Sequence, residues 1–334
     1  MYYLLGICLG LAALLAINVL ATMMAATLWR FIKRYARLWS ALTRAKFLLV
    51  LRVWPPICSL LTVTMLLLPA YIIYEPRQSG EAISAKLALL TLISVFGIAL
   101  AAWRGAASWA ATRRLVSVWM MDAEALSLEG VLVPAYRIKH QFPVIAVVGA
   151  LRPKLFIASQ LFETLSPEEI AAAVRHEIGH LFACDNLKRP VMRACCDVLA
   201  LVPCGRSLDS AWKEAAEAAA DEFTARADRA QGALALASAI IKIARQIPQG
   251  TSPALPAGAF LIAEAGDDIA RRIRQLVRLA EVDLPPRRPG TLLLCHGIGV
   301  PLCAVLIALT LLIMQTDLLH RSHVVIEQLV HALR

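Results

Sequence analysis

Two histidines and a glutamate in this chain have a spacing that can bind and use a metal ion. In the run EEIAAAVRHEIGHLFACDN, residues 168–186, they are His176, Glu177 and His180. A helix turns by about 100° per residue, so His180 lies about 40° from His176 and all three side chains share one side. In this HExxH spacing two neutral imidazoles bind zinc and the glutamate acts as a general base. The run therefore predicts a zinc site with a hydrolytic carboxylate.

A catalytic zinc ion needs a third protein ligand and an open coordination position. The downstream run EAAEAAADE offers Glu217 and, one helical turn later, Asp221 on the same face. We expect Glu217 to bind the metal and Asp221 to accept the N–H of a ligating histidine, which fixes its tautomer. Glu214, one turn earlier, is the competing ligand. Glu217 is preferred because it has the acidic partner four residues on.

The same region of the sequence predicts the two helices that position these residues. The run LSPEEI predicts a helix start, with Ser166 as the cap and Glu169 closing a capping box, and the helix should run to about Cys184. Residues 210–231 should form a second long helix, which Gly232 breaks or bends.

Strands are expected ahead of the metal helix. A helix through about residue 125 is predicted to come first. Three short β-branched or aromatic runs, separated by proline and glycine, then predict a small sheet: 131–138, 142–149 and 154–159.

Composition indicates a membrane protein. Hydrophobic residues make up 59% of the 334 residues and charged residues only 17%, against about 25% charged in soluble domains. The mean hydropathy is +0.65. Crossing a hydrocarbon core of about 30 Å takes roughly 20 apolar residues in a helix. Four stretches qualify: 2–29, 47–74, 87–103 and 291–316.

Basic residues beside these stretches predict the topology. Loop 30–46 carries six Lys or Arg residues and no acid, so it should be cytoplasmic. Basic residues also flank both ends of segment 104–290. We therefore expect three transmembrane helices within 1–103, a cytoplasmic domain at 104–290, a fourth transmembrane helix at 291–316 and a short extracytoplasmic tail at 317–334. The chain would be a multi-pass protein of the cell (inner) membrane with both termini outside the cytoplasm.

The net charge of +10 is explained without nucleic acid. Much of it lies next to membrane helices, where the bias of cytoplasmic loops towards Lys and Arg accounts for it. The expected partners are the lipid bilayer and a cytoplasmic protein or peptide substrate, and no direct nucleic-acid binding is expected.

The HEIGH helix followed by an E-x-x-x-D helix resembles the gluzincin metallopeptidases, the thermolysin-like clan. Within that clan, residues 130–225 resemble the BlaR/MecR-type integral membrane peptidases that sense β-lactams. The resemblance implies an α+β membrane protein: four transmembrane helices and a cytoplasmic gluzincin zinc peptidase domain, mostly helical with a small β-sheet. It also implies that an edge strand beside the metal helix pairs with extended substrate.

Two departures from the BlaR/MecR pattern are visible. A large penicillin-binding domain follows the last membrane helix of the antibiotic sensors, whereas 18 residues follow Thr316 here, so sensing a β-lactam in that way is not expected. The run FACDN also replaces basic residues that often precede the Asp-Asn pair. Nine residues after His176, Asp185 should point away from the metal on an ideal helix and is interpreted as a structural terminator.

The expected function is zinc-dependent endopeptidase activity on a cytoplasmic protein, such as a repressor or the chain itself, with one Zn²⁺ per chain. His140 and Arg226 are candidates for stabilising the oxyanion. One alternative is a heat-shock or CAAX-type membrane peptidase, which shares both motifs but places membrane helices between them. The other is a non-catalytic zinc scaffold for signalling, with Cys184 as a possible fourth ligand.

Overall fold

The computed structural model describes most of the chain up to residue 281. The described residues are 2–76, 83–128, 130–202, 204–246 and 266–281, with Val324 and Gln328. The predicted fourth membrane helix at 291–316 lies outside them, as does nearly all of the tail at 317–334. Within the described part the protein is mostly helical and has one small sheet.

Among the described residues, three continuous helical segments are long and apolar enough to cross a membrane. They are α1 (Tyr2–Ile32), the segment Ala41–Tyr74 and α4 (Ala85–Trp119). The second segment consists of α2 (Ala41–Thr62), the π-helical turn η2 (Val63–Leu67) and α3 (Leu68–Tyr74), and a short 3₁₀ turn, η1 (Ala36–Leu38), precedes it. The first three predicted membrane helices are therefore each found within a longer helix.

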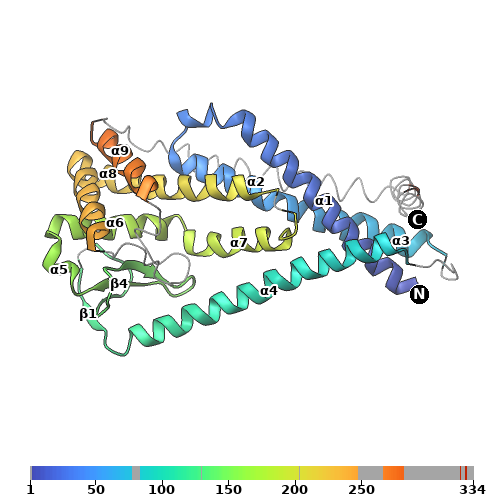
Figure 1. Ribbon diagram of the computed structural model, residues 1–334, viewed down its shortest axis with the longest axis horizontal. Helices are drawn as coiled ribbons and strands as arrows, with labels where there is room; N and C mark the ends of the chain where they lie inside the picture. Colours follow the sequence, from blue (N-terminus) through green and yellow to red (C-terminus); the bar gives the residue numbers. More distant parts are fainter. Residues whose placement is uncertain are drawn as a thin grey trace.

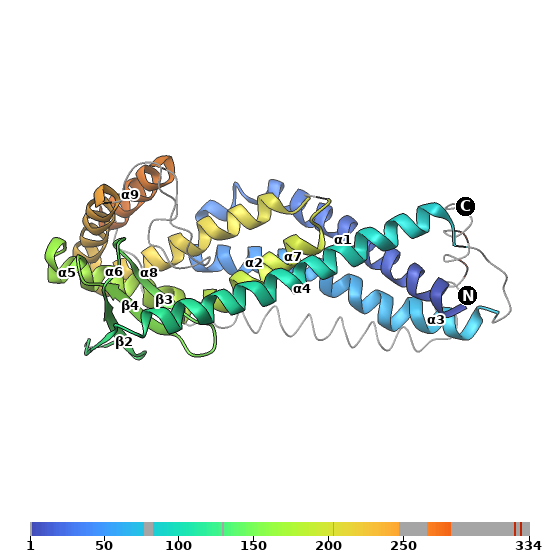
Figure 2. The same cartoon turned by 60° about the horizontal axis from the view of Figure 1, so that its bottom comes forward.

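Helix α4 joins the membrane part to the rest of the molecule without a break. It continues past the predicted limit at residue 103 and ends at Trp119, which is buried against Phe156 with ring centroids 5.1 Å apart. The predicted helix through about residue 125 is thus the end of α4 and stops earlier. In both views α4 runs from the end that holds the N-terminus to the sheet at the other end (Figures 1 and 2).

The sheet has four strands in the order β1-β2-β4-β3. Their bounds are β1 (Glu124–Leu126), β2 (Ala135–Ile138), β3 (Ile145–Val148) and β4 (Lys154–Ala158). β2 and β4 pair in parallel, while β1 with β2 and β3 with β4 are antiparallel. The three predicted strand runs each contain one strand; β1 was not predicted. β3 is an edge strand, and all four of its residues are buried.

Five helices follow the sheet in the part of the chain that the structure describes. They are α5 (Leu161–Thr164), α6 (Pro167–Phe182), α7 (Asp185–Val198), α8 (Arg206–Gln246) and α9 (Gly266–Glu281). α6 begins with the predicted capping box: the Ser166 side chain accepts the Glu169 N–H, and the Glu169 carboxylate accepts the Ser166 N–H. Both reciprocal bonds satisfy backbone donors that the first helical turn leaves open.

Helix α8 is continuous but bends near Gly232, as the glycine suggested. A Cβ added to Gly232 would lie 3.0 Å from the carbonyl oxygen of Thr224, although eight residues of straight helix rise about 12 Å. The Thr224 hydroxyl also bonds back to the Ala220 carbonyl, a contact that tends to bend helices. The yellow and orange parts of α8 accordingly run in different directions in Figure 1.

The two halves of α8 belong to different hydrophobic clusters. The part after the bend packs with the sheet, α6 and α9. The part before it packs on the ends of α1 and α2 around Trp212. Two polar contacts strengthen this second junction: Asp209 accepts from Arg52 Nε at 2.9 Å, and Glu222 Oε1 accepts from the Ala41 backbone N–H at 3.0 Å. α8 therefore connects the membrane helices, which contact its part before the bend, to the sheet, α6 and α9, which contact its part after the bend.

Candidate metal centre

Helix α6 places the two histidines of the HEIGH run one turn apart in the interior. The capping box sets where α6 begins, and the intervals of four and one residues then put His176, Glu177 and His180 on its inner side. All three side chains are buried. Buried imidazoles and a buried carboxylate require polar partners, because an unpaired buried polar group is costly.

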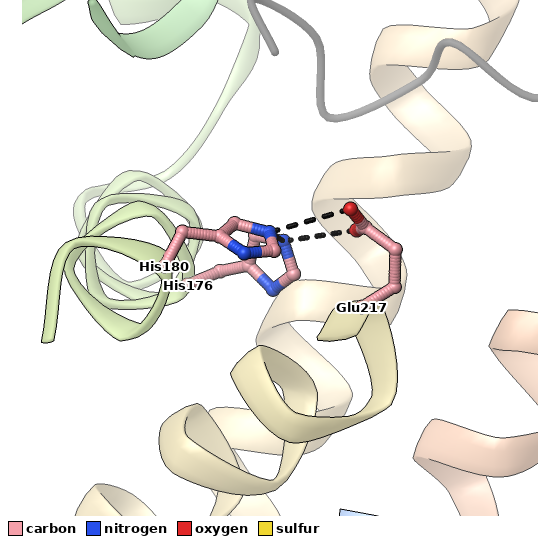
Figure 3. A group of neighbouring side chains, drawn as sticks. All are labelled: His176, His180 and Glu217. Atoms are coloured by element: carbon pink, nitrogen blue, oxygen red, sulfur yellow. Dashed lines mark hydrogen bonds and ion pairs between the residues drawn. The ribbon is translucent and has the colours of Figure 1, made fainter. Parts of the chain in front are cut away.

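Glu217 comes to the histidines because α8 packs closely against α6. Gly179 makes this approach possible, since a Cβ there would lie 3.1 Å from Cα of Ala220 and 3.3 Å from Cβ of Phe223. A larger residue at position 179 would push the two helices apart. Figure 3 shows His176 and His180 on one helix pointing at the Glu217 carboxylate on the other.

The candidate ligand atoms of the three side chains lie close together. His176 Nε2 lies 3.2 Å from His180 Nε2. Glu217 Oε2 lies 3.4 Å from His176 Nε2, and Glu217 Oε1 lies 3.4 Å from His180 Nε2. Tetrahedral bonds of about 2.0–2.1 Å to zinc place ligand atoms about 3.3 Å apart. His176, His180 and Glu217 thus form a buried cluster that could hold a metal ion.

Each histidine also has a carboxylate at its other ring nitrogen. Asp221 Oδ1 lies 2.9 Å from Nδ1 of His176, the contact expected from the Glu217–Asp221 spacing. Asp185 Oδ2 lies 2.8 Å from Nδ1 of His180. A carboxylate at Nδ1 keeps the proton on that nitrogen and leaves Nε2 free to bind a metal.

The interpretation of Asp185 as a terminator that points away from the metal is wrong. It assumed that the helix continues, but α6 ends at Phe182 and Cys184 adopts the left-handed conformation with φ 57°. This single residue interrupts the helix, so α7 starts at Asp185, whose carboxylate Oδ2 lies at His180 Nδ1.

Glu177 is bound to the edge strand rather than to a metal-ligand residue. Its Oε2 accepts the backbone N–H of Val147 in β3 at 3.2 Å. The Asn186 side chain holds the same strand, because its Nδ2 donates to the carbonyl oxygens of Val147 at 3.0 Å and Gly149 at 3.1 Å. The general-base candidate and the edge strand are therefore direct neighbours.

Two arginines that the motifs did not reveal contact the cluster. Arg189 of α7 donates to Glu217 Oε1 at 3.2 Å. Arg272 of α9 is buried, and its guanidinium contacts Asp221, His176 and Glu217. No local spacing ties either arginine to the motif. The only signal in the sequence is the concentration of arginines in the run ARRIRQLVR, which could pair with carboxylates.

Charged neighbours shift the pKa values of His180 and Glu217. Burial works against a charged His180, but the nearby Glu217 carboxylate and the hydrogen bonds that His180 donates to Asp185 and Glu217 outweigh it and raise the pKa of His180 to about 9. Burial likewise opposes the charged form of Glu217, yet His180, His176 and Arg272 hold its pKa well below the usual range. Without a metal, His180 thus keeps a proton that a binding metal must displace.

Four other residues considered from the sequence lie apart from this cluster in the described structure. Glu214 is exposed and faces Arg271 at 3.9 Å, and Cys184 is exposed. His140 packs against Trp119 and bonds within its own turn to Phe142. Arg226 Nη2 lies 3.7 Å from Glu222 Oε2.

Comparison with known proteins identifies no family for this chain. No protein-family model matches the chain, and no curated protein matches it at a significant level.

Proposed function

We propose that the protein is a membrane-anchored, zinc-dependent endopeptidase that cleaves a cytoplasmic protein, in a pathway of the BlaR/MecR type. The observation that carries this proposal is the group of His176, His180 and Glu217, whose ligand atoms lie close enough together to hold a metal ion, with Glu177 in the same HExxH run. The carboxylates at both Nδ1 atoms support it, since partners of this kind are typical of histidines that bind metals.

In this mechanism the two imidazoles and Glu217 hold the ion, and bound zinc supplies the Lewis acidity that activates a water molecule and polarises the scissile carbonyl. Glu177 takes a proton from the attacking water and returns it to the leaving amine. Asp221 and Asp185 keep His176 and His180 in the metal-binding tautomer. Burial of the site excludes bulk water and strengthens each of these interactions.

The ligand set favours catalysis over a scaffold role. Structural zinc sites are usually closed by four Cys or His ligands, whereas catalytic sites have three protein ligands and an open position. Among the residues that the structure describes, the candidate ligand group has three members. Cys184, the suggested fourth ligand, is exposed and stands outside this group.

The chain between the two motifs favours the BlaR/MecR layout over that of the heat-shock and CAAX peptidases. Its main element is α7, which has 14 residues and begins with Asp-Asn-Leu-Lys-Arg. A helix of this length is too short to cross a bilayer. The described part of this connection contains no candidate span.

The proposal can be tested with the whole chain in detergent or nanodiscs. Zinc content and cleavage of an unfolded reporter protein, together with self-cleavage, would be measured for the wild type, Glu177→Gln and Glu217→Ala. Glu177→Gln should retain zinc and abolish hydrolysis, while Glu217→Ala should lose zinc; exposed Glu214→Ala is the matched control. Retention of hydrolysis by Glu177→Gln would refute the mechanism. A substrate would be sought by co-purification with Glu177→Gln.

A further inference from the structure

The Arg272 guanidinium donates two hydrogen bonds to the Asp221 carboxylate. Its Nε lies 3.0 Å from Oδ2, and its Nη2 lies 2.8 Å from Oδ1. A guanidinium fork of this kind fixes the plane of a carboxylate, which a single point charge does not. Both side chains are buried, at 7% and 1% exposure, so little solvent is available to replace these bonds.

The orientation that this fork imposes on Asp221 matters to the metal centre. Asp221 Oδ1 also lies 2.9 Å from Nδ1 of His176. Arg272 therefore holds the same oxygen that must receive the Nδ1 proton, and the second bond at Oδ2 prevents the carboxylate from rotating away. In this arrangement His176 keeps its Nε2 lone pair directed at the cluster.

The fork is compatible with a bound metal. Nη2 also lies 3.0 Å from His176 Nε2 and 3.2 Å from His176 Nδ1, so it lies over the face of the imidazole and off the in-plane direction of the Nε2 lone pair that a metal would need. Nη1 lies 3.4 Å from Glu217 Oε2. The two bonds to Asp221 do not compete with the metal and can persist.

Helix α9 is anchored in the core, so Arg272 is a fixed part of the site. Leu276, four residues on and hence on the same helical face, is fully buried in the main hydrophobic cluster. Ile269 and Ile273 pack against that cluster as well. Releasing α9 as a lid would expose this apolar face, which makes a movable blocking role unfavourable.

We infer that Arg272 is a positioning residue of the metal centre, which acts through Asp221 to hold His176 ready for the metal. The inference rests on the metal site of the proposed function. It explains why a guanidinium lies beside a site for a divalent cation: the cost of placing a positive charge there is offset by the two carboxylates, Asp221 and Glu217, that it contacts.

A double-mutant cycle on metal binding tests this role. Affinity for Zn²⁺ and Co²⁺ would be measured on the full chain in detergent by competition with a chromophoric chelator. Arg272→Ala and Asp221→Ala should each weaken binding by about 10- to 100-fold. The double variant should bind about as weakly as Asp221→Ala alone, because one residue acts through the other. The Co²⁺ absorption spectrum should change in the same way in both single variants.

Two further variants keep the test decisive. Arg271→Ala changes the neighbouring arginine, which is exposed and pairs with Glu214, and should bind metal like the wild type. Arg272→Lys keeps the charge without the fork and should fall between the wild type and Arg272→Ala. If Arg272→Ala does not fold, Arg272→Lys tests the inference instead. Its metal affinity should be lower than that of the wild type, and its Co²⁺ spectrum should be changed.

The possible failures are distinguishable. A wild-type chain that binds no metal would overturn both the proposed function and this inference. If the wild type binds metal and cleaves, but Arg272→Ala binds it equally or more tightly, only the inference fails and Arg272 acts as a competitor for the site. Additive losses in the double variant would likewise refute action through Asp221.

Discussion

The backbone N–H of Val147 donates a hydrogen bond to Glu177 Oε2, which joins the edge strand β3 to the proposed general base. This bond also identifies the backbone groups of β3 that point away from β4. Ala158 N donates to the Val144 carbonyl at 2.8 Å, so the backbone groups of Val144 and Ala146 face β4 in the alternating antiparallel pattern, while those of Ile145 and Val147 face outward. Val147 bonds with Glu177 and Asn186, and Ile145 is the other outward position, with which we predict that an extended substrate pairs.

The first prediction follows from this alternation. Ile145→Pro removes an outward N–H and should lower kcat/KM by about 3- to 10-fold, the value of one hydrogen bond, with zinc retained. Ala146→Pro is the control, since it removes a bond to β4 and should lower the melting temperature instead. Normal cleavage by a folded, zinc-bound Ile145→Pro would mean that substrate is held elsewhere, for instance by the membrane helices.

A second prediction separates the neighbours Asp185 and Asn186. Asp185→Ala removes the partner of His180 Nδ1 and should weaken zinc affinity by about 10- to 100-fold. Asn186→Ala frees the carbonyls of Val147 and Gly149 and should impair cleavage while zinc affinity stays unchanged. Titration with a chelator and kinetics on the same samples would measure both effects. Equal zinc affinity in the two variants would contradict the role of Asp185.

The third prediction concerns acid stability. Burial raises the pKa of Glu169, but hydrogen bonds from Lys242, Ser238 and the Ser166 N–H outweigh it, so the pKa lies below its usual value. A group whose pKa is lower in the folded chain stabilises fully above the unfolded pKa of about 4.3 and loses this contribution as the pH falls through the folded pKa.

Glu169→Gln should therefore lower the melting temperature at pH 7, and the difference from the wild type should shrink as the pH falls below about 4.3 and through the lower pKa of the folded state. Exposed Glu168, which bonds the Ser166 hydroxyl, is the matched control, and its replacement by Gln should change the melting temperature much less. A pH-independent difference for Glu169→Gln would indicate that packing, and not the charge, is responsible.

The fourth prediction concerns topology. The basic loop 30–46 and the metal domain should lie on the same, cytoplasmic side, because Glu222 of α8 bonds the first residue of α2 and Asp209 pairs with Arg52. Reporters that are active only outside the cytoplasm should be inactive when fused within 104–246 and active when fused after Arg334. A cytoplasmic signal after Arg334 would show that the number of spans or their orientation is wrong.

Short-range periodicity in the sequence is enough to predict several features of the site and of the membrane helices. The interval from His176 to His180 places both on one face of any α-helix, and Ser166 with Glu169 specifies where that helix starts. The interval from Glu217 to Asp221 works in the same way, and long apolar runs identify membrane helices by length alone. Each of these patterns repeats within a few residues, so no knowledge of the fold was needed.

The distant groups that complete the centre are selected by the packing of the folded chain. Asp185 reaches His180 because one left-handed residue, Cys184, interrupts the helix, and helical periodicity cannot anticipate such an interruption. Arg272 meets Asp221 across 51 residues of sequence because α9 packs its apolar face into the main cluster. Hydrophobic burial is nondirectional and favours many pairings, so it is the packing of whole helices that selects these partners and brings one guanidinium to the site.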